Sequence, residues 1–391
     1  MARSLLSAAA VRERAHELLA VALDGGLAEW RVDLEQLPAT ADLVAEVVRA
    51  NYPDLKVPFH ARWRHFAVGG PDLWADGVAA RPFADREAQA RAAFDLAIIS
   101  VLLDAGAGMA WRYRDAATGT ELSRSEGLAI ASLRLFESGA LSADPADPRR
   151  ADGLAKVDEA LLAEAFQVGD ANPLVGLEGR AALLRRLGEV VGRPGRLYDL
   201  MAGRAEGGRL PAPLILETLL TELGPIWPGR LELAGVALGD CWRHPALRRD
   251  DATDQLVPLH KLSQWLAYSL IEPLQAAGLE VTDIDGLTGL AEYRNGGLFV
   301  DAGVLVLKHA ADAARSHPVE GPLVVGWRAL TVALLDEIAP LVRERLGVRA
   351  EDFPLARVLE GGTWAAGRRL ARERRADGGP PIAVISDGTV F

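Results

Sequence analysis

The stretch Leu287-Thr-Gly-Leu-Ala-Glu-Tyr-Arg-Asn-Gly-Gly-Leu-Phe-Val-Asp-Ala-Gly303 sets five polar side chains among apolar residues, unlike an ordinary surface loop. The five are Glu292, Tyr293, Arg294, Asn295 and Asp301. Because an unpaired carboxylate or guanidinium is costly to bury, and burial shifts its pKa, this cluster suits proton-transfer chemistry. A cluster of structural salt bridges that joins two helices would give the same pattern. The catalytic and the structural interpretations both stay open.

The whole chain has the composition of a globular protein and few features of a nucleic-acid or membrane protein. Half of its 391 residues are hydrophobic and its net charge is −11, which argues against general nucleic-acid binding. No run approaches eighteen uncharged apolar residues, and the N-terminus lacks a secretory pattern, so we expect no membrane span. Cys241 is the only cysteine, which excludes an intramolecular disulfide and fits a reducing, cytoplasmic location.

Helical periodicity recurs in at least eight segments, whereas strand-like alternation is confined to 109–122 and the C-terminus. We therefore expect a mainly α fold with at most a small peripheral sheet. The tail 380–391 is expected to pair with the segment around Trp111, and the basic helix 361–375 to be solvated. A linker at 144–148 predicts an N-terminal lobe of residues 1–148, a C-terminal lobe of residues 149–391, and a pocket between them.

A second polar-aromatic stretch is Val57-Pro-Phe-His-Ala-Arg-Trp-Arg-His-Phe66. Four of its side chains are candidates for binding an anion or a sugar, namely His60, Arg62, Arg64 and His65. Phe59, Trp63 and Phe66 could serve as stacking surfaces. A packed aromatic corner with surface arginines is the alternative. No cysteine or third nearby histidine completes a ligand set, so we predict no metal site.

A third polar face lies in the segment 257–268. His260, Gln264 and Tyr268 are four residues apart, on one side of a predicted helix, and Lys261 and Trp265 lie beside them. This face is either directed at a ligand or exposed to solvent. We predict that residues 59–66, 260–265 and 292–301 line one pocket, because ligand sites gather a few polar groups against apolar walls.

The glycine pair Gly296-Gly297 permits positive φ or a close backbone approach to a ligand. The common nucleotide-binding glycine motifs and the Gly-x-Ser-x-Gly elbow are absent from the sequence, so no cofactor is predicted. Near residue 124, Ser123 and Glu126 have the spacing of a capping box at a helix start.

Several of these motifs resemble one known family. Val57–Phe66, Arg124-Ser-Glu-Gly-Leu-Ala129, Val257–Trp265, Ala291–Phe299 and the closing Ile385-Ser-Asp-Gly-Thr-Val-Phe391 are similar to the uracil-catabolism proteins of fungi and bacteria, the Urc/Urg type. The resemblance covers essentially the whole chain. It implies a role in a pathway that opens the pyrimidine ring after uracil becomes its ribonucleotide, with ribosylurea-type intermediates.

A more distant likeness concerns Leu287–Arg294 and Asp301-Ala-Gly-Val-Leu305, which are similar to a segment of queuosine-salvage N-glycosylases. That resemblance implies a multi-helical, DNA-glycosylase-like architecture. In those enzymes the Tyr-Arg pair follows Asp, whereas here it follows Glu292.

Together the resemblances imply hydrolysis of an N-glycosidic bond, which needs a carboxylate near an oxocarbenium-like carbon. We expect Glu292 to be the catalytic carboxylate, with Asp301 second. The expected substrate-binding residues are His60, Arg62, Trp63, Arg64, His260, Lys261, Trp265, Tyr293, Arg294 and Asn295. The expected partner is a small ribosyl or ribose-phosphate substrate, and the sequence allows a homo-oligomer. A non-catalytic binding or scaffold protein, and a hydrolase of ureido C–N bonds, are the alternatives.

Overall fold

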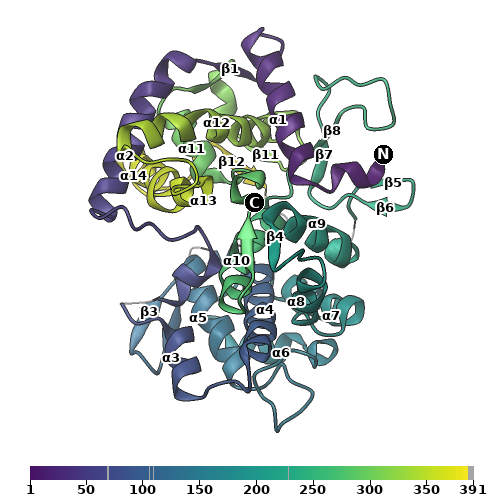
Figure 1. Ribbon diagram of the computed structural model, residues 1–391. Helices are drawn as coiled ribbons and strands as arrows, with labels where there is room; N and C mark the ends of the chain where they lie inside the picture. Colours follow the sequence, from purple (N-terminus) through teal and green to yellow (C-terminus); the bar gives the residue numbers. More distant parts are fainter. Residues whose placement is uncertain (68–69, 105, 109, 228, 386–391) are drawn as a thin grey trace.

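The computed structural model describes residues 1–67, 70–104, 106–108, 110–227 and 229–385, which are mainly helical (Figure 1). The α-helices are α1 (Ala8–Leu23), α2 (Leu37–Asn51), α3 (Leu73–Ala80), α4 (Arg86–Leu102), α5 (Arg124–Glu137), α6 (Glu159–Ala165), α7 (Leu177–Val191), α8 (Arg196–Ala202), α9 (Ala212–Leu223), α10 (Lys261–Ala276), α11 (Tyr293–Asp301), α12 (Pro322–Leu346), α13 (Leu355–Val358) and α14 (Trp364–Arg374). Within the described chain, every helix is too short or too polar to cross a bilayer.

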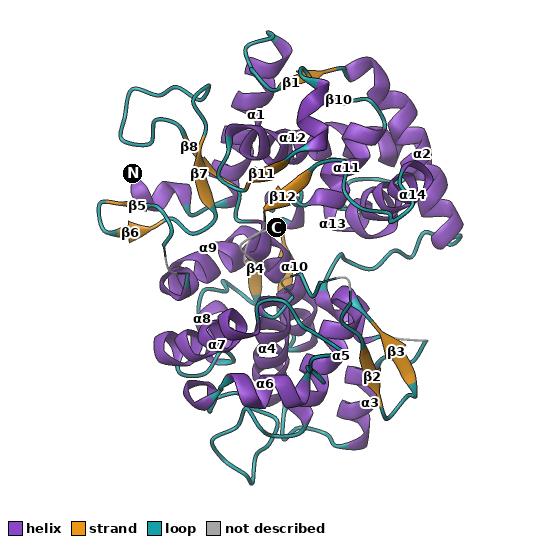
Figure 2. Cartoon of the chain, turned by 180° about the vertical axis from the view of Figure 1, so that it is seen from behind, coloured by secondary structure: helices purple, strands orange, loops and turns teal. Residues whose placement is uncertain are grey.

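The strands are short and pair in twos around the helices (Figure 2). The pairs are β1 (Trp30–Val32) with β10 (Leu305–Leu307), β2 (Tyr113–Asp115) with β3 (Thr120–Leu122), β4 (Arg209–Pro211) with β9 (Glu280–Thr282), β5 (Glu232–Leu233) with β6 (Val236–Ala237), β7 (Cys241–Arg243) with β8 (Leu256–Pro258), and β11 (Ser316–Pro318) with β12 (Ala383–Ile385). The prediction of a mainly α fold with a minor sheet component is confirmed. The finer likeness to DNA glycosylases stays a prediction.

The expected partner of the C-terminal tail is wrong. β12 runs parallel to β11, with Ser316 opposite Ala383. The segment after Trp111 instead forms its own hairpin, in which Tyr113 lies opposite Leu122. A local hairpin satisfies the backbone donors and acceptors of that segment without a distant strand. The last residues of the tail, 386–391, lie outside the described residues.

The longest helix, α12, is the centre of one group of helices. It is buried on most of its circumference, from Leu323 to Val342, as expected of a helix that is apolar on nearly all sides. α1, α2 and α11 pack directly against it. The group therefore combines the first helices of the chain with the last ones.

A second group is built around α4, which packs against α5, α8 and α10. One continuous core of buried side chains joins the two groups, which lie one above the other in Figure 1. This packing does not follow a boundary at residue 148, because α1 and α2 belong with the C-terminal helices. We propose lobes defined by packing, one formed by the helices around α12 and the other by the helices around α4.

The close contact between α11 and α14 depends on Gly367. A Cβ added at Gly367 would overlap the carbonyl oxygen of Arg294 and lie 3.0 Å from its carbonyl carbon. Backbone atoms cannot yield as a flexible side chain can, so only glycine fits without displacing one helix. This contact fixes where the first turn of α11 lies relative to the arginines of α14.

We predict that Gly367→Ala lowers the free energy of unfolding by about 1–3 kcal/mol, even though alanine favours helix. The matched control is Gly179→Ala in α7, where an added Cβ meets no atom within 4 Å. The control should lose no stability. Urea unfolding of both variants checks this, and an equal response of the two would contradict the packing account.

Candidate functional site

Two adjoining cavities open between the two groups of helices. We call the first the inner cavity; it has a volume of about 400 Å³ and is lined in part by His60, Lys261, Trp265, Glu292 and Trp364. The second, the arginine cavity, has a volume of about 610 Å³. Both are lined by Arg124, Tyr293, Arg294, Asp377, Gly378, Gly379 and Pro380, so they are compartments of one cleft.

Glu292 is the N-cap residue of α11 and lines the inner cavity. Its carboxylate accepts hydrogen bonds from the backbone N–H of Arg294 at 2.9 Å and of Asn295 at 2.5 Å. These donors are groups that a helix start leaves unsatisfied. This backbone capping holds a negative charge in a fixed orientation at the cavity wall.

Lys261 is partly buried at the start of α10, on the same cavity. Among the described residues, no hydrogen bond or ion pair reaches its Nζ atom. Burial lowers the pKa of Lys261, whereas the charges of Glu292 and Asp104 oppose that shift. A cation that lacks a partner beside a fixed carboxylate is a group available to a ligand.

The position of Lys261 is fixed through Asp240. The carboxylate of Asp240 accepts the backbone N–H of Lys261 at 3.0 Å and both terminal nitrogens of Arg328, at 2.8 and 2.7 Å. Arg328 also donates to the carbonyl of Ala291, next to Glu292. One buried ion pair therefore sets both Lys261 and Glu292 in place.

His60 forms a pair with Glu360, with 2.6 Å between its Nδ1 and the carboxylate. Burial would raise the pKa of Glu360, but the hydrogen bond with His60 and the nearby charge of Arg64 outweigh it and lower that pKa. The imidazole lies near two indoles, with its ring centre 6.3 Å from that of Trp265 and 6.0 Å from that of Trp364. The cavity thus holds an oriented histidine near aromatic walls.

A second histidine, His65, also lines the inner cavity. Burial and then the neighbouring charge of Arg62 lower the pKa of His65 to about 3, so the ring is neutral at ordinary pH. Its ring stands edge-on to that of Trp265. His65 can therefore act as a neutral donor or acceptor but not as a cation.

Of the expected site residues, His60, Lys261, Trp265, Glu292, Tyr293 and Arg294 meet at the inner cavity. Tyr293 and Arg294 contact each other, since Arg294 Nε donates to the Tyr293 hydroxyl at 3.0 Å. The Arg294 guanidinium also lies over the Trp364 ring, 4.5 Å from its centre. All three sequence stretches of the predicted pocket thus contribute to one cavity.

The other three candidates of the 59–66 stretch, Arg62, Trp63 and Arg64, bind to the protein behind the cavity lining. Arg62 is fully buried and pairs with Asp104 at 2.9 Å. The Trp63 indole donates to the carbonyl of Ser269 at 2.6 Å. Arg64 pairs with Glu272 at 2.5 Å. These three side chains are not among the lining residues of the inner cavity.

Three further candidates are also internal. The Nε2 atom of His260 lies 2.8 Å from the carbonyl of Leu5. The amide oxygen of Asn295 accepts the hydroxyl of Thr363 at 2.9 Å. Asp301 binds both terminal nitrogens of Arg375, at 2.8 and 2.6 Å. His260, Asn295 and Asp301 therefore support the fold around the cleft without lining the inner cavity.

The glycine pair serves packing. A Cβ on Gly296 would lie 2.7 Å from the Trp327 indole nitrogen, and one on Gly297 would lie 3.3 Å from Pro381. Neither glycine has positive φ. Gly296 therefore brings α11 close to α12, while Gly297 lies at the floor of the arginine cavity.

Sequence reasoning missed several residues that line the cleft or hold its lining residues in place. Glu360 lies in a π-helical turn, Leu359–Thr363, which would be a signal of function if it were visible in sequence. Arg368 and Arg372 line the arginine cavity, although helix 361–375 was expected to be solvated. Their four-residue spacing, beside Trp364, was the available signal. The capping box is also absent, because Ser123 makes no capping hydrogen bond and Glu126 pairs with Arg368.

Among the described residues, no group of three or more His, Cys, Asp or Glu side chains is arranged to hold a metal ion. The inner cavity is lined instead by His60, which pairs with Glu360, and by Lys261 and Glu292. These are groups suited to binding and proton transfer.

Comparison with known proteins identifies the family. A family model described as "Protein of unknown function (DUF1688)" matches residues 4–391, so the chain belongs to this family. Protein urg3 of Schizosaccharomyces pombe is 40% identical over 403 residues, covering 99% of this chain and 98% of the relative. Uracil catabolism protein 4 of Lachancea kluyveri is 36% identical over 418 residues, covering 94% and 93%. The resemblance to the Urc/Urg type is confirmed.

The lysines provide a direct check of the cavity. The chain has four lysines, Lys56, Lys156, Lys261 and Lys308. We predict that the acylation rate of Lys261 rises with pH around a midpoint below 10.5, its ordinary value. Glu292→Gln should lower this midpoint further, because it removes a charge that stabilises the ammonium. Mass spectrometry of each lysine measures this.

The internal control is Lys56, whose side chain is 85% exposed. Its labelling profile should be the same in both proteins. An unchanged Lys261 profile in Glu292→Gln would show that the two groups do not interact across the cavity.

Proposed function

We propose that this member of the DUF1688 family takes part in uracil catabolism by hydrolysing the N-glycosidic bond of a ribosylurea-like compound in the inner cavity. The name of the Lachancea kluyveri relative, at 36% identity over 94% of this chain, supports the pathway. The observation that carries the reaction is that the fixed Glu292 carboxylate and Lys261 line one cavity together with the indoles of Trp265 and Trp364.

In this proposal Glu292 stabilises the positive charge that develops on the anomeric carbon. Glycosidic cleavage passes through an oxocarbenium-like state, and a preorganised carboxylate lowers its energy without reorganising. The two N–H donors of α11 occupy a lone pair on each oxygen and fix the carboxylate. This arrangement suits charge stabilisation better than proton transfer.

The proposed general base is His60. A water molecule attacks the anomeric carbon, the C–N bond breaks with its electron pair going to the urea nitrogen, and one proton of the water passes to His60 Nε2. The departing nitrogen takes up a proton from solvent and His60 returns its proton to solvent, so that neutral urea leaves and the free histidine is restored. Glu360 is a positioning residue, since its carboxylate holds the other ring nitrogen at 2.6 Å and stabilises the protonated ring. The products are urea and a ribose.

Lys261 is proposed to donate a hydrogen bond to the carbonyl of the departing urea. Its ammonium has no partner among the described residues, and a cation at this position stabilises charge that moves onto the leaving group. Trp265 and Trp364 form the walls that exclude water from the sugar. Tyr293 and Arg294 line the passage to the second compartment.

The proposal gives Arg62, Trp63, Arg64, His260, Asn295 and Asp301 supporting roles rather than contacts with substrate. Each makes a hydrogen bond or ion pair to the protein, as described above. Asp301, expected as a second carboxylate, is engaged by Arg375 through both oxygens. The catalytic assignment therefore narrows to Glu292 with His60.

A non-catalytic binding protein is the second candidate, favoured by the capping role of Glu292. A helix cap alone accounts for its two hydrogen bonds and would be present without any chemistry. A hydrolase of ureido C–N bonds would use the same cavity but release ammonia. Product analysis with purified protein and ribosylurea separates the three, since only the proposed reaction releases urea and ribose.

We predict that Glu292→Gln lowers turnover of ribosylurea at least about a hundredfold. The amide keeps one accepting oxygen, so the stability loss should stay within about 1 kcal/mol. Release of urea and the melting temperature, measured on one preparation, test this. A variant that melts earlier yet turns over normally would show that Glu292 is only a cap.

A matched control is Asp85→Asn. Asp85 caps α4 in the same way, accepting the N–H of Ala88 at 2.7 Å, and lies outside both cavities. Asp85→Asn replaces a capping carboxylate with its amide, as Glu292→Gln does. The stability of the Asp85→Asn variant should change by about as much as that of Glu292→Gln, while its turnover of ribosylurea stays unchanged.

A further inference from the structure

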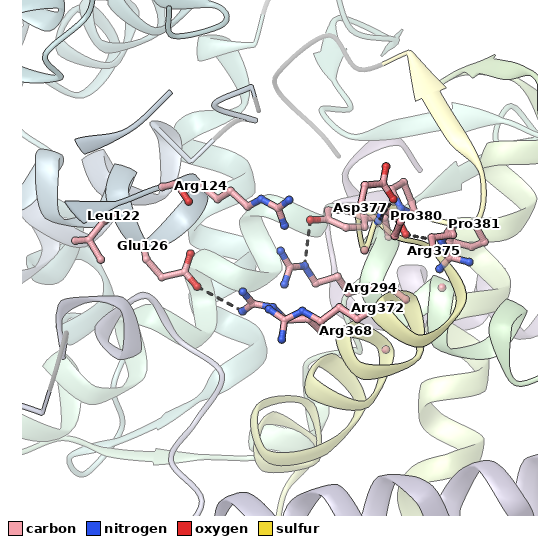
Figure 3. Close-up of a pocket in the computed structure, with 18 of the residues that line it drawn as sticks. Leu122, Arg124, Glu126, Arg294, Arg368, Arg372, Arg375, Asp377, Pro380 and Pro381 are labelled. Carbon is pink, nitrogen blue, oxygen red and sulfur yellow. Dashed lines mark hydrogen bonds and ion pairs between the residues drawn. The ribbon is translucent and has the colours of Figure 1, made fainter. Parts of the chain in front are cut away.

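The arginine cavity gathers positive charge from three helices. Figure 3 shows the guanidinium groups of Arg124, Arg294, Arg368 and Arg372 directed into the same space. Arg124 comes from the first turn of α5, Arg294 from α11, and the other two from one face of α14. These helices are far apart in sequence, so the fold brings the cluster together.

Arginines outnumber carboxylates along this cavity, since six arginines line it beside Glu121, Glu126 and Asp377. Glu126 reaches Arg368 only at 3.5 Å, and both side chains are partly exposed. Among the described residues, no ion pair or hydrogen bond engages the side chain of Arg372, which is exposed. Arg294 bonds to the neutral Tyr293 hydroxyl. The cavity therefore carries an excess of cations within a protein whose net charge is −11.

Two polar atoms of the cluster are buried without a partner among the described residues, Nη1 of Arg294 and Nε of Arg368. Buried donors are normally hydrogen-bonded, and an unsatisfied one calls for an explanation. Burial and then the charge of Arg294 lower the pKa of Arg368. Like charges held this close favour an anion that binds between them.

We propose that the arginine cavity binds the phosphate of a phosphorylated ribosyl substrate, a phosphomonoester whose anomeric carbon lies in the inner cavity. This rests on the proposed function for the placement of the sugar. Guanidinium groups match phosphate oxygens in paired, planar hydrogen bonds. The shared lining residues, among them Tyr293 and Arg294, let one molecule occupy both compartments.

A small phosphomonoester fits this cavity better than a nucleic-acid strand. The cluster is confined to a space of about 610 Å³. The substrate class that follows is the 5-phosphate of an N-ribosylurea-like compound.

The test is calorimetric titration of the full-length protein with ribose 5-phosphate, ribose and inorganic phosphate. Ribose 5-phosphate should bind at least about tenfold more tightly than either fragment, because it occupies both compartments. Arg372→Gln and Arg368→Gln should each weaken it about tenfold, equivalent to about 1.4 kcal/mol. Ribose binding should not change.

Arg369→Gln is the matched control on the same helix. Arg369 pairs with Glu46 and Glu373 on the exposed side of α14 and does not line the cavity. It removes the same charge and should leave binding unchanged. Equal binding of ribose and ribose 5-phosphate, or equal effects of Arg369→Gln and Arg372→Gln, would overturn the phosphate site.

The test distinguishes this inference from the proposed reaction. Arginine-dependent binding of ribose 5-phosphate without hydrolysis of either N-riboside would support the phosphate site and refute the reaction. Equal kcat/KM for ribosylurea and its 5-phosphate would support the reaction and refute the phosphate site.

Discussion

The buried ion pair between Asp240 and Arg328 connects the segments that carry the cleft. Arg328 is about 1% exposed and binds both carboxylate oxygens of Asp240. Burial alone would raise the pKa of Asp240, but the charge of Arg328 outweighs it and lowers that pKa to about 2. The pair is therefore charged at physiological pH, and losing either partner would strand a buried charge. Through it, the start of α10 and the residue before Glu292 keep a fixed relation.

Much of the fold and part of the site follow from local sequence. Helical periodicity predicted the mainly α fold that the structure shows. The mixture of polar and apolar residues in Leu287–Gly303 predicted Glu292, Tyr293 and Arg294 as site residues, because polar side chains among apolar ones indicate a partly buried cluster. The same reasoning found Lys261 and Trp265. These residues share one property, namely that their sequence neighbours already reveal an unusual environment.

The rest could not be predicted because distant partners decide it. Arg62 looked like a ligand-binding cation, but Asp104 lies 42 residues away and pairs with it in the core. Asp301 looked catalytic until Arg375, 74 residues on, engaged both its oxygens. Arg372 shows the reverse case. The sequence of a basic helix predicts exposure to solvent, but residues from α5 and α11 lie across the cavity from this one. Whether a charged side chain stabilises the fold or is available to a ligand therefore depends on whether another residue of the protein pairs with it.

The central claim is that one ligand spans the two compartments, with its phosphate among the arginines and its anomeric carbon beside Glu292. A crystal structure of the protein with ribose 5-phosphate tests this most directly. The account predicts phosphate oxygens within hydrogen-bond distance of Arg294, Arg368 or Arg372, and the anomeric carbon in the inner cavity between Trp265 and Trp364. A ligand bound elsewhere, or bound with its phosphate beside Lys261 and its sugar outside the inner cavity, would contradict it.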